Sequence, residues 1–156
     1  MNREKRHIDF GRYPILVAED DPDDQLLIKE AFAESGLSVE LHFVGDGEEL
    51  VDRLDLYLKN NGTGSHPKPL CILLDLNMPR KDGREALKEI RTIPEFQDLD
   101  VIVLTTSDSP QDRMYCSELG VSDFVTKPGS FNELIEFAQK VQSNLSDISS
   151  KRKTCR

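Results

Sequence analysis

The chain has 156 residues, of which 37% are hydrophobic and 31% charged, and its formal net charge at pH 7 is −9. This size and balance are those of one ordinary globular domain, and the acidic charge argues against nucleic-acid binding through a basic surface. No apolar run is long enough to span a membrane, the charged N-terminus is not a signal peptide, and 3 scattered cysteines favour a reducing cytoplasm over a disulfide framework.

The first predicted elements are a buried strand and a helix. The run Tyr-Pro-Ile-Leu-Val-Ala at residues 13–18 predicts the strand, with its proline near the start, where a strand tolerates one. The run of acids that follows is more typical of a cation site than of a diffuse solubility feature. Within it, Asp21 precedes a proline, and this pair predicts a helix cap and the first helical residue. Asp23 and Asp24 suit the positive end of the helix dipole, and Gly36 ends the helix.

The later segments continue the alternation of strand and helix. Further buried strands are predicted over residues 39–44, 70–74, 101–106 and 123–127. Helices are predicted over about residues 46–58, after Gly83, from Pro110 to Gly120, and after Ser130, which forms a capping box with Glu133. A loop is predicted over residues 60–67. These alternations predict an α/β fold, a doubly wound parallel sheet of five strands built by right-handed crossovers.

In such a sheet the carboxyl ends of all strands share one edge, where open α/β sheets place their chemistry. The residues expected there are Glu19, Asp20, Asp75, Thr105 and Lys127. Taken alone, Asp75 could equally be the cap of a turn. Three carboxylates in one place need a cation, and hard oxygen ligands suit Mg²⁺. The hydroxyl and the ammonium could then hold an oxyanion, so the set favours transfer of a phosphoryl group to a carboxylate.

The sequence resembles response-regulator receiver domains over residues 13–145. The matching motifs, in the order of the family, are ILVAEDD at 15–21, LDLNMP at 74–79, Gly83, LTT at 104–106 and FVTKP at 124–128. Each falls at the predicted end of a strand or just after one. The resemblance implies the flavodoxin-like strand order 2-1-3-4-5. It also implies a phosphoacceptor protein of a two-component phosphorelay, which is not an enzyme although it assists its own phosphorylation and dephosphorylation.

The resemblance also implies a metal site. Asp75 would accept the phosphoryl group and bind the metal, Asp20 would bind Mg²⁺ directly, and Glu19 would act through water. The backbone carbonyl of Asn77 would complete the site. Because three acids are consecutive, Asp21 could be mistaken for one of the pair, and we assign it instead as the helix cap.

Residue roles in signalling follow from the same resemblance. Thr105 and Lys127 would contact the phosphoryl oxygens, and the Lys127–Pro128 peptide bond is cis in the family. Phe124 occupies the family's aromatic switch position, for which a simple core phenylalanine is the alternative. Movement of Thr105 and of this ring would repack the face made by the fourth helix, fifth strand and fifth helix. Asn77 and Ser107 would flank the path of attacking water and set the lifetime of the phosphate.

Domain boundaries and partners complete the expectations. Residues 1–12 are an N-terminal extension, residues 13–145 the receiver domain, and residues 146–156 a polar tail expected to be disordered. No output domain follows, which predicts a stand-alone receiver, and the insertion at residues 59–68 could form a partner surface. The resemblance extends to single-domain regulators paired with phytochrome-type histidine kinases. It implies a kinase partner, a possible homodimer through the switch face, and no contact with membranes or nucleic acid.

Three alternatives remain to be compared. A phosphatase of the haloacid dehalogenase type would need an acid where Asn77 stands, and a dinucleotide-binding domain would need a glycine-rich first turn. A pseudo-receiver, acting as a phosphate-independent adaptor, is the principal alternative. The three histidines, His7, His42 and His66, show no metal-binding spacing, and the basic tail is interpreted as a solvated end.

Overall fold

The structure is a computed structural model that describes residues 14–36, 39–60 and 68–154. Its strands are β1 (Ile15–Ala18), β2 (Leu41–Val44), β3 (Cys71–Leu74), β4 (Val101–Thr105) and β5 (Asp123–Thr126). Its helices are α1 (Pro22–Glu34), α2 (Gly47–Lys59), α3 (Gly83–Arg91), α4 (Pro110–Glu118) and α5 (Phe131–Thr154), with a short 3₁₀ helix, η1 (Pro94–Phe96), that the sequence analysis missed.

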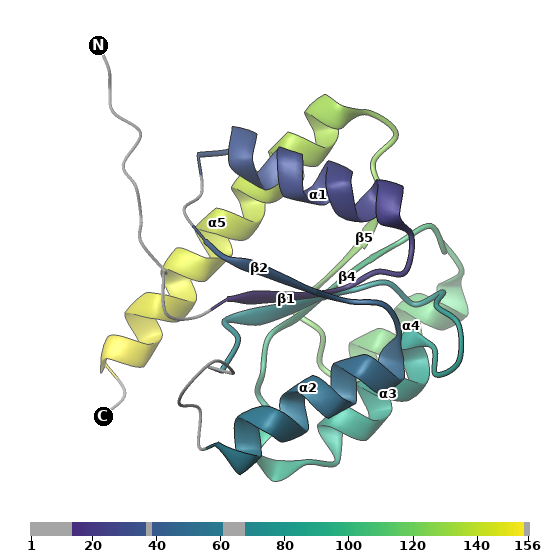
Figure 1. Cartoon of the computed structure of the whole chain (residues 1–156), viewed down its shortest axis with the longest axis vertical. Helices are drawn as coiled ribbons and strands as arrows, with labels where there is room; N and C mark the ends of the chain where they lie inside the picture. Colours follow the sequence, from purple (N-terminus) through teal and green to yellow (C-terminus); the bar gives the residue numbers. More distant parts are fainter. Residues whose placement is uncertain (1–13, 37–38, 61–67, 155–156) are drawn as a thin grey trace.

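The strands form one parallel sheet in the order β2-β1-β3-β4-β5. Helices α1 and α5 cover one face of this sheet, and α2, α3 and α4 cover the other (Figure 1). The predicted doubly wound fold and its strand order 2-1-3-4-5 are therefore confirmed. All strand carboxyl ends consequently meet at one edge of the sheet.

The sheet has one hydrophobic core on each face. Alternate residues of each strand pack in different cores, because successive side chains of a strand point to opposite faces. Ile15 and Val17 of β1 pack in the core under α1 and α5, whereas Leu16 and Ala18 pack in the core under α2 and α3. The central strands are thus buried on both faces, which explains why they are continuous apolar runs in the sequence. Within the described ranges, no helix is both long and apolar enough to cross a membrane.

Several element ends differ from the prediction. The first strand begins at Ile15 rather than at residue 13, and the fourth ends at Thr105 rather than at residue 106. Helix α5 continues to Thr154 and so includes residues 146–154, which the sequence analysis assigned to the tail. Neither glycine nor proline occurs after Gly129 to interrupt this helix. The expectation for the loop at residues 61–67 lies outside the described residues.

Two local predictions need correction. No described peptide bond is cis, so the Lys127–Pro128 bond is trans, an isomer that any X-Pro bond adopts readily. The capping box at α5 is only half formed. Ser130 Oγ accepts from the backbone N–H of Glu133 at 3.2 Å, but the Glu133 carboxylate bonds that same hydroxyl rather than the backbone N–H of Ser130.

Candidate functional site

The acidic cluster is built by the register of two adjacent strands. Ala18 of β1 pairs with Leu74 of β3, so the next residues, Glu19 and Asp75, leave the sheet side by side. One carboxylate oxygen from each of Glu19, Asp20 and Asp75 lies within 4.8 Å of the others. Glu19 and Asp75 are buried and Asp20 is exposed. The structure therefore brings together the three acids that the sequence analysis selected.

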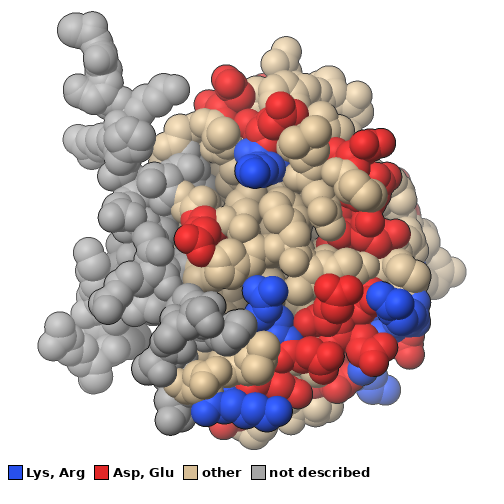
Figure 2. All heavy atoms as spheres, viewed as in Figure 1, with Lys and Arg blue, Asp and Glu red and all other residues tan. Residues whose placement is uncertain are grey.

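Asp21 lies outside this cluster and begins α1 instead. Its side chain accepts a hydrogen bond of 2.9 Å from the backbone N–H of Asp23, which is the predicted cap. Its own backbone N–H donates to Glu19 Oε2 at 3.1 Å and so helps to orient that carboxylate. On the surface, acidic side chains gather along the right-hand side of the molecule, the side on which α1 begins (Figures 1 and 2).

Lys127 follows β5 and reaches into the cluster. Its ammonium lies 2.7 Å from Glu19 Oε1, 2.8 Å from Asp24 Oδ2 and 3.3 Å from Asp75 Oδ2. Burial alone would lower the pKa of Lys127, but the hydrogen bonds to Asp24 and Glu19, with the charge of Asp75, raise it above its usual range. The ammonium is therefore held in its charged form beside Asp75.

The role of Asp24 in this contact was missed. From the sequence, Asp24 was expected only to favour the dipole of the first helix. The acidic run that contains Asp24 predicts a charged site. The sequence does not reveal which of these acids contacts the residue after β5, because this depends on how α1 lies across the sheet.

Burial and a neighbouring negative charge both shift the pKa of Glu19. Burial raises the pKa of Glu19, the nearby charge of Asp75 raises it further, and the bonds from Lys127 and from the Asp21 N–H oppose both effects without cancelling them. A divalent cation among these oxygens would relieve the repulsion, and carboxylate oxygens are the ligands that Mg²⁺ and Mn²⁺ prefer. The donor set therefore fits a hard divalent cation.

The loop after β3 is held close to Asp75. Asn77 is exposed, and its backbone N–H donates to Asp75 Oδ1 at 3.1 Å. The N–H of Gly83 donates to the carbonyl of Leu76 at 2.9 Å. A Cβ at Gly83 would lie 2.3 Å from the carbonyl oxygen of Asp75, so only glycine fits at the start of α3. This explains physically why the motif places a glycine at residue 83.

The predicted switch residues lie on β4 and β5. Thr105 is fully buried, and its Oγ1 accepts a hydrogen bond of 3.3 Å from the N–H of Ser107. Phe124 is half-buried and packs against the core under α2 and α3, with the guanidinium of Arg113 lying 4.6 Å from its ring centroid. The ring thus contacts the core on one side and a cation of α4 on the other.

A second network that the sequence analysis missed connects the loops after β3 and β4. Arg84 binds Asp112 through two hydrogen bonds of 2.6 Å, and Ser107 Oγ donates to the same carboxylate. Arg84 also approaches Asn77 Oδ1 at 3.4 Å. No spacing rule links Arg84 with Asp112, which are 28 positions apart, so only the packing of α3 beside α4 reveals the pair.

Three of the candidate residues are buried, which ordinary surface polar residues are not. The polar side chains buried in the described part of the chain are Glu19, Asp46, Asp75 and Thr105. Of these four, Asp46 is paired with Arg80, which donates a hydrogen bond of 2.7 Å to its carboxylate. The other three all lie at the carboxyl edge of the sheet. Buried charges are costly unless they are paired or bind a metal, so their gathering at one place indicates a functional site.

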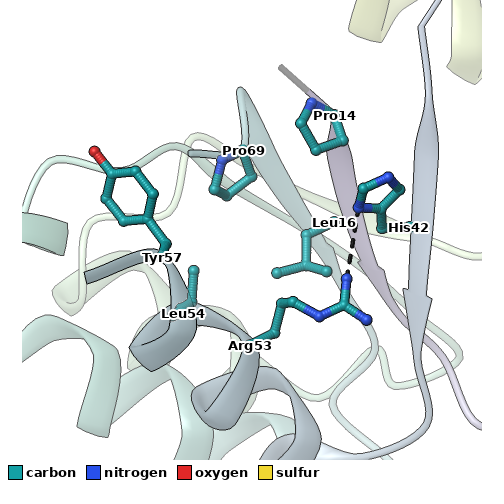
Figure 3. Close-up of a pocket in the computed structure, with 7 residues that line it drawn as sticks. All are labelled: Pro14, Leu16, His42, Arg53, Leu54, Tyr57 and Pro69. Atoms are coloured by element: carbon teal, nitrogen blue, oxygen red, sulfur yellow. Dashed lines mark hydrogen bonds between the residues drawn. The ribbon is translucent and has the colours of Figure 1, made fainter. Parts of the chain in front are cut away.

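Figure 3 shows a small pocket elsewhere, beside the amino ends of β1 and β3. It is lined by Pro14, Leu16, His42, Arg53, Leu54, Tyr57 and Pro69. His42 lies 3.5 Å from Arg53 Nη1 there and also bonds Glu40, and among the described residues it belongs to no group of three potential metal ligands. His7 and His66 lie outside the described ranges. None of the predicted site residues lines this pocket.

Comparisons with known proteins identify relatives over most of the chain. The family model described as the response regulator receiver domain matches residues 15–139. The response regulator Rcp1 of Synechocystis sp. is 36% identical over 130 residues, which cover 83% of this chain and 86% of Rcp1.

Solved structures agree with this match. The phosphorylated cyanobacterial phytochrome response regulator RcpA is 34% identical, with a TM-score of 0.71 over 83% of this chain and 91% of RcpA. The Mn²⁺-bound form of Rcp1 is 35% identical, with a TM-score of 0.70 over 84% of this chain and 92% of that one. The chain thus has a relative whose structure contains a divalent cation.

Proposed function

The chain belongs to the response regulator receiver family, and on this premise we propose that Asp75 accepts a phosphoryl group from a histidine kinase. The observation that carries the proposal is the position of Lys127, whose ammonium lies 3.3 Å from Asp75 Oδ2 at a buried edge that also holds Glu19. A carboxylate held beside a cation in a partly dry site suits attack on an anionic phosphoryl group.

The transfer conserves atoms and charge. A carboxylate oxygen of Asp75 attacks phosphorus, and a P–O bond forms. The P–N bond of a phosphohistidine that is protonated on its other ring nitrogen breaks, and its electron pair stays on the ring as neutral imidazole. Lys127 donates to a phosphoryl oxygen during this step, and the hydroxyl of Thr105 donates to another once β4 and its loop adjust.

Mg²⁺ is the proposed cofactor. Glu19, Asp20, Asp75 and the backbone carbonyl of Asn77 would hold it, with Glu19 acting through water. When bound, the metal neutralises the charge that gathers on the phosphoryl oxygens. Oxygen ligand chemistry supports Mg²⁺, and the similarity to Mn²⁺-bound Rcp1 supports a divalent cation without distinguishing the two metals.

The output is proposed to be a change of the α4–β5–α5 face. Thr105 would move towards the phosphoryl group and Phe124 would turn inward, which would exchange its contact with Arg113 for core packing. The similarity to the phytochrome response regulator RcpA supports a phytochrome-type kinase as phosphodonor. A homodimer through the α4–β5–α5 face is the proposed form of the output. Water passing Asn77 and Ser107 would hydrolyse the acyl phosphate and end the signal.

Incubation with acetyl phosphate and Mg²⁺, followed by intact-mass analysis and size-exclusion chromatography with light scattering, tests the proposal. The expected result is a gain of one phosphoryl group, its absence in Asp75→Asn, and a changed association state. Asp23→Asn is the matched control, because it removes an exposed acid of the same surface and should leave the mass gain intact. A wild-type chain with no mass gain would instead be a phosphate-independent adaptor.

A further inference from the structure

The ammonium of Lys127 is fully occupied by three carboxylates. A lysine has three N–H donors, and Glu19, Asp24 and Asp75 each place one oxygen within 2.7 to 3.3 Å of Nζ. The contact with Asp75 is the longest, at 3.3 Å, and that with Asp24 is 0.5 Å shorter. A phosphoryl oxygen can therefore accept a hydrogen bond from Lys127 only when one of these carboxylates releases the N–H that it binds.

Asp24 differs from the other two acids. Glu19 and Asp75 belong to the cluster that fits a divalent cation, whereas Asp24 is not part of that cluster. Its carboxylate is 34% exposed, compared with 3% for Glu19 and 6% for Asp75, so water can solvate it if it releases the lysine. Asp24 is thus the acid that can most easily exchange its contact for solvent.

We propose that Asp24 is a positioning residue that occupies one N–H donor of Lys127 and so slows phosphorylation of Asp75. The inference rests on the proposed function, because it concerns the rate of the same transfer. The contact joins residues that are 103 positions apart in the chain. Through it, the first turn of α1 restrains Lys127 in the unphosphorylated receiver.

Two physical effects act in the same direction. First, loss of the Asp24 carboxylate would free one N–H of Lys127 for a phosphoryl oxygen. Second, the phosphodonor is an anion that approaches four carboxylates, those of Glu19, Asp20, Asp24 and Asp75, so removal of one negative charge lowers the repulsion. If such an interaction alters the barrier by as much as exposed charge pairs alter stability, the rate changes by about three- to tenfold.

The test compares Asp24→Asn with Asp23→Asn. Both substitutions remove one acid from the first turn of α1, so they change the net charge and the helix-dipole interaction alike, but only Asp24 contacts Lys127. Phosphorylation by acetyl phosphate is followed by intact mass at saturating Mg²⁺, with saturation established for each variant by titration. Asp24→Glu is the conservative variant, and thermal unfolding verifies that all variants fold alike.

The expected result is that Asp24→Asn is phosphorylated about three- to tenfold faster than wild type, whereas Asp23→Asn and Asp24→Glu stay within about twofold. The Mg²⁺ affinity of Asp24→Asn should fall slightly, since the site loses negative charge. If Asp24→Asn matches Asp23→Asn, or reacts more slowly than wild type, the inference is wrong although the proposed function stands. If wild type itself gains no phosphoryl group, both are wrong.

Discussion

Arg84 at the start of α3 and Asp112 at the start of α4 form a two-point ion pair, with Nε–Oδ1 and Nη2–Oδ2 distances of 2.6 Å. Ser107 donates to the same carboxylate, and the hydroxyl of Tyr115 donates to the carbonyl of Arg84 at 3.1 Å. The pair therefore joins the loop after β4 to the helix that follows the phosphoacceptor loop. It restrains the segment that must move if Thr105 approaches a phosphoryl group.

The first prediction concerns acid stability. Hydrogen bonds from Arg84 hold the pKa of Asp112 far below its usual range; burial opposes this shift and the Ser107 hydroxyl adds to it. A carboxyl with a depressed folded-state pKa stabilises the fold above its unfolded pKa of about 3.9, and this contribution is lost as the pH falls towards the folded value. We expect Asp112→Asn to lower the free energy of unfolding by about 2 kcal/mol at pH 7.

Urea unfolding from pH 7 down to pH 3 measures this effect. The difference between wild type and Asp112→Asn should be constant above about pH 5 and should shrink below about pH 4. Asp108→Asn is the matched control, because Asp108 lies in the loop just before α4, is exposed, and should change the stability by less than about 0.5 kcal/mol. A pH-independent difference would show that Asp112 stabilises the fold by packing rather than by charge.

The second prediction concerns Gly83. Alanine is the better helix former, yet its Cβ would lie 2.3 Å from the carbonyl oxygen of Asp75 and 2.8 Å from the Cα of Leu76. Gly83→Ala should therefore destabilise the protein by about 1 to 3 kcal/mol and should also slow phosphorylation, since it displaces the backbone of the phosphoacceptor.

Gly129→Ala is the control for that substitution, because its Cβ would meet only Glu133 Oε1, at 3.9 Å. Thermal unfolding and the rate of mass gain with acetyl phosphate are the two measurements. Equal unfolding temperatures for the two variants would mean that the loop after β3 yields to a methyl group without strain.

The third prediction concerns the cation. Asp20 is the exposed member of the acidic cluster, so Asp20→Ala should spare the fold and weaken Mg²⁺ or Mn²⁺ binding by about tenfold or more. Isothermal titration with each metal measures the affinity, and Asp23→Asn is again the control for net charge. If the metal affinity falls equally in both variants, Asp20 acts through the negative charge of the surface and not as a metal ligand.

The fourth prediction separates phosphorylation from its output. Thr105→Ala removes a hydroxyl that accepts from the Ser107 N–H, at a cost of about 1 kcal/mol in stability. The variant should still gain a phosphoryl group on Asp75 but should no longer change its association state, whereas Thr105→Ser keeps the hydroxyl and should behave as wild type. Light scattering before and after treatment with acetyl phosphate makes the comparison. A normal response of the alanine variant would contradict the switch role of Thr105.

The fold class and the edge of the sheet that holds the candidate site could both be predicted from the order of residues. Buried parallel strands are continuous apolar runs, and the residue that follows each run must emerge at the carboxyl edge. Glu19, Asp75 and Lys127 could therefore be placed together before any coordinates were known. The cap at Asp21 was equally local, because an acid before a proline satisfies backbone donors within the same turn.

The contacts between side chains of different elements could not be predicted and came from the packing of the helices on the sheet. Asp24 binds Lys127 because α1 lies over the end of β5, and Arg84 binds Asp112 because α3 packs beside α4. The sequence analysis expected a cis Lys127–Pro128 bond and a tail after residue 145, whereas the structure has a trans bond and a helix that continues to Thr154, since either isomer and either helix end cost little locally. Such contacts depend on the relative placement of whole helices, which local periodicity and capping signals do not specify.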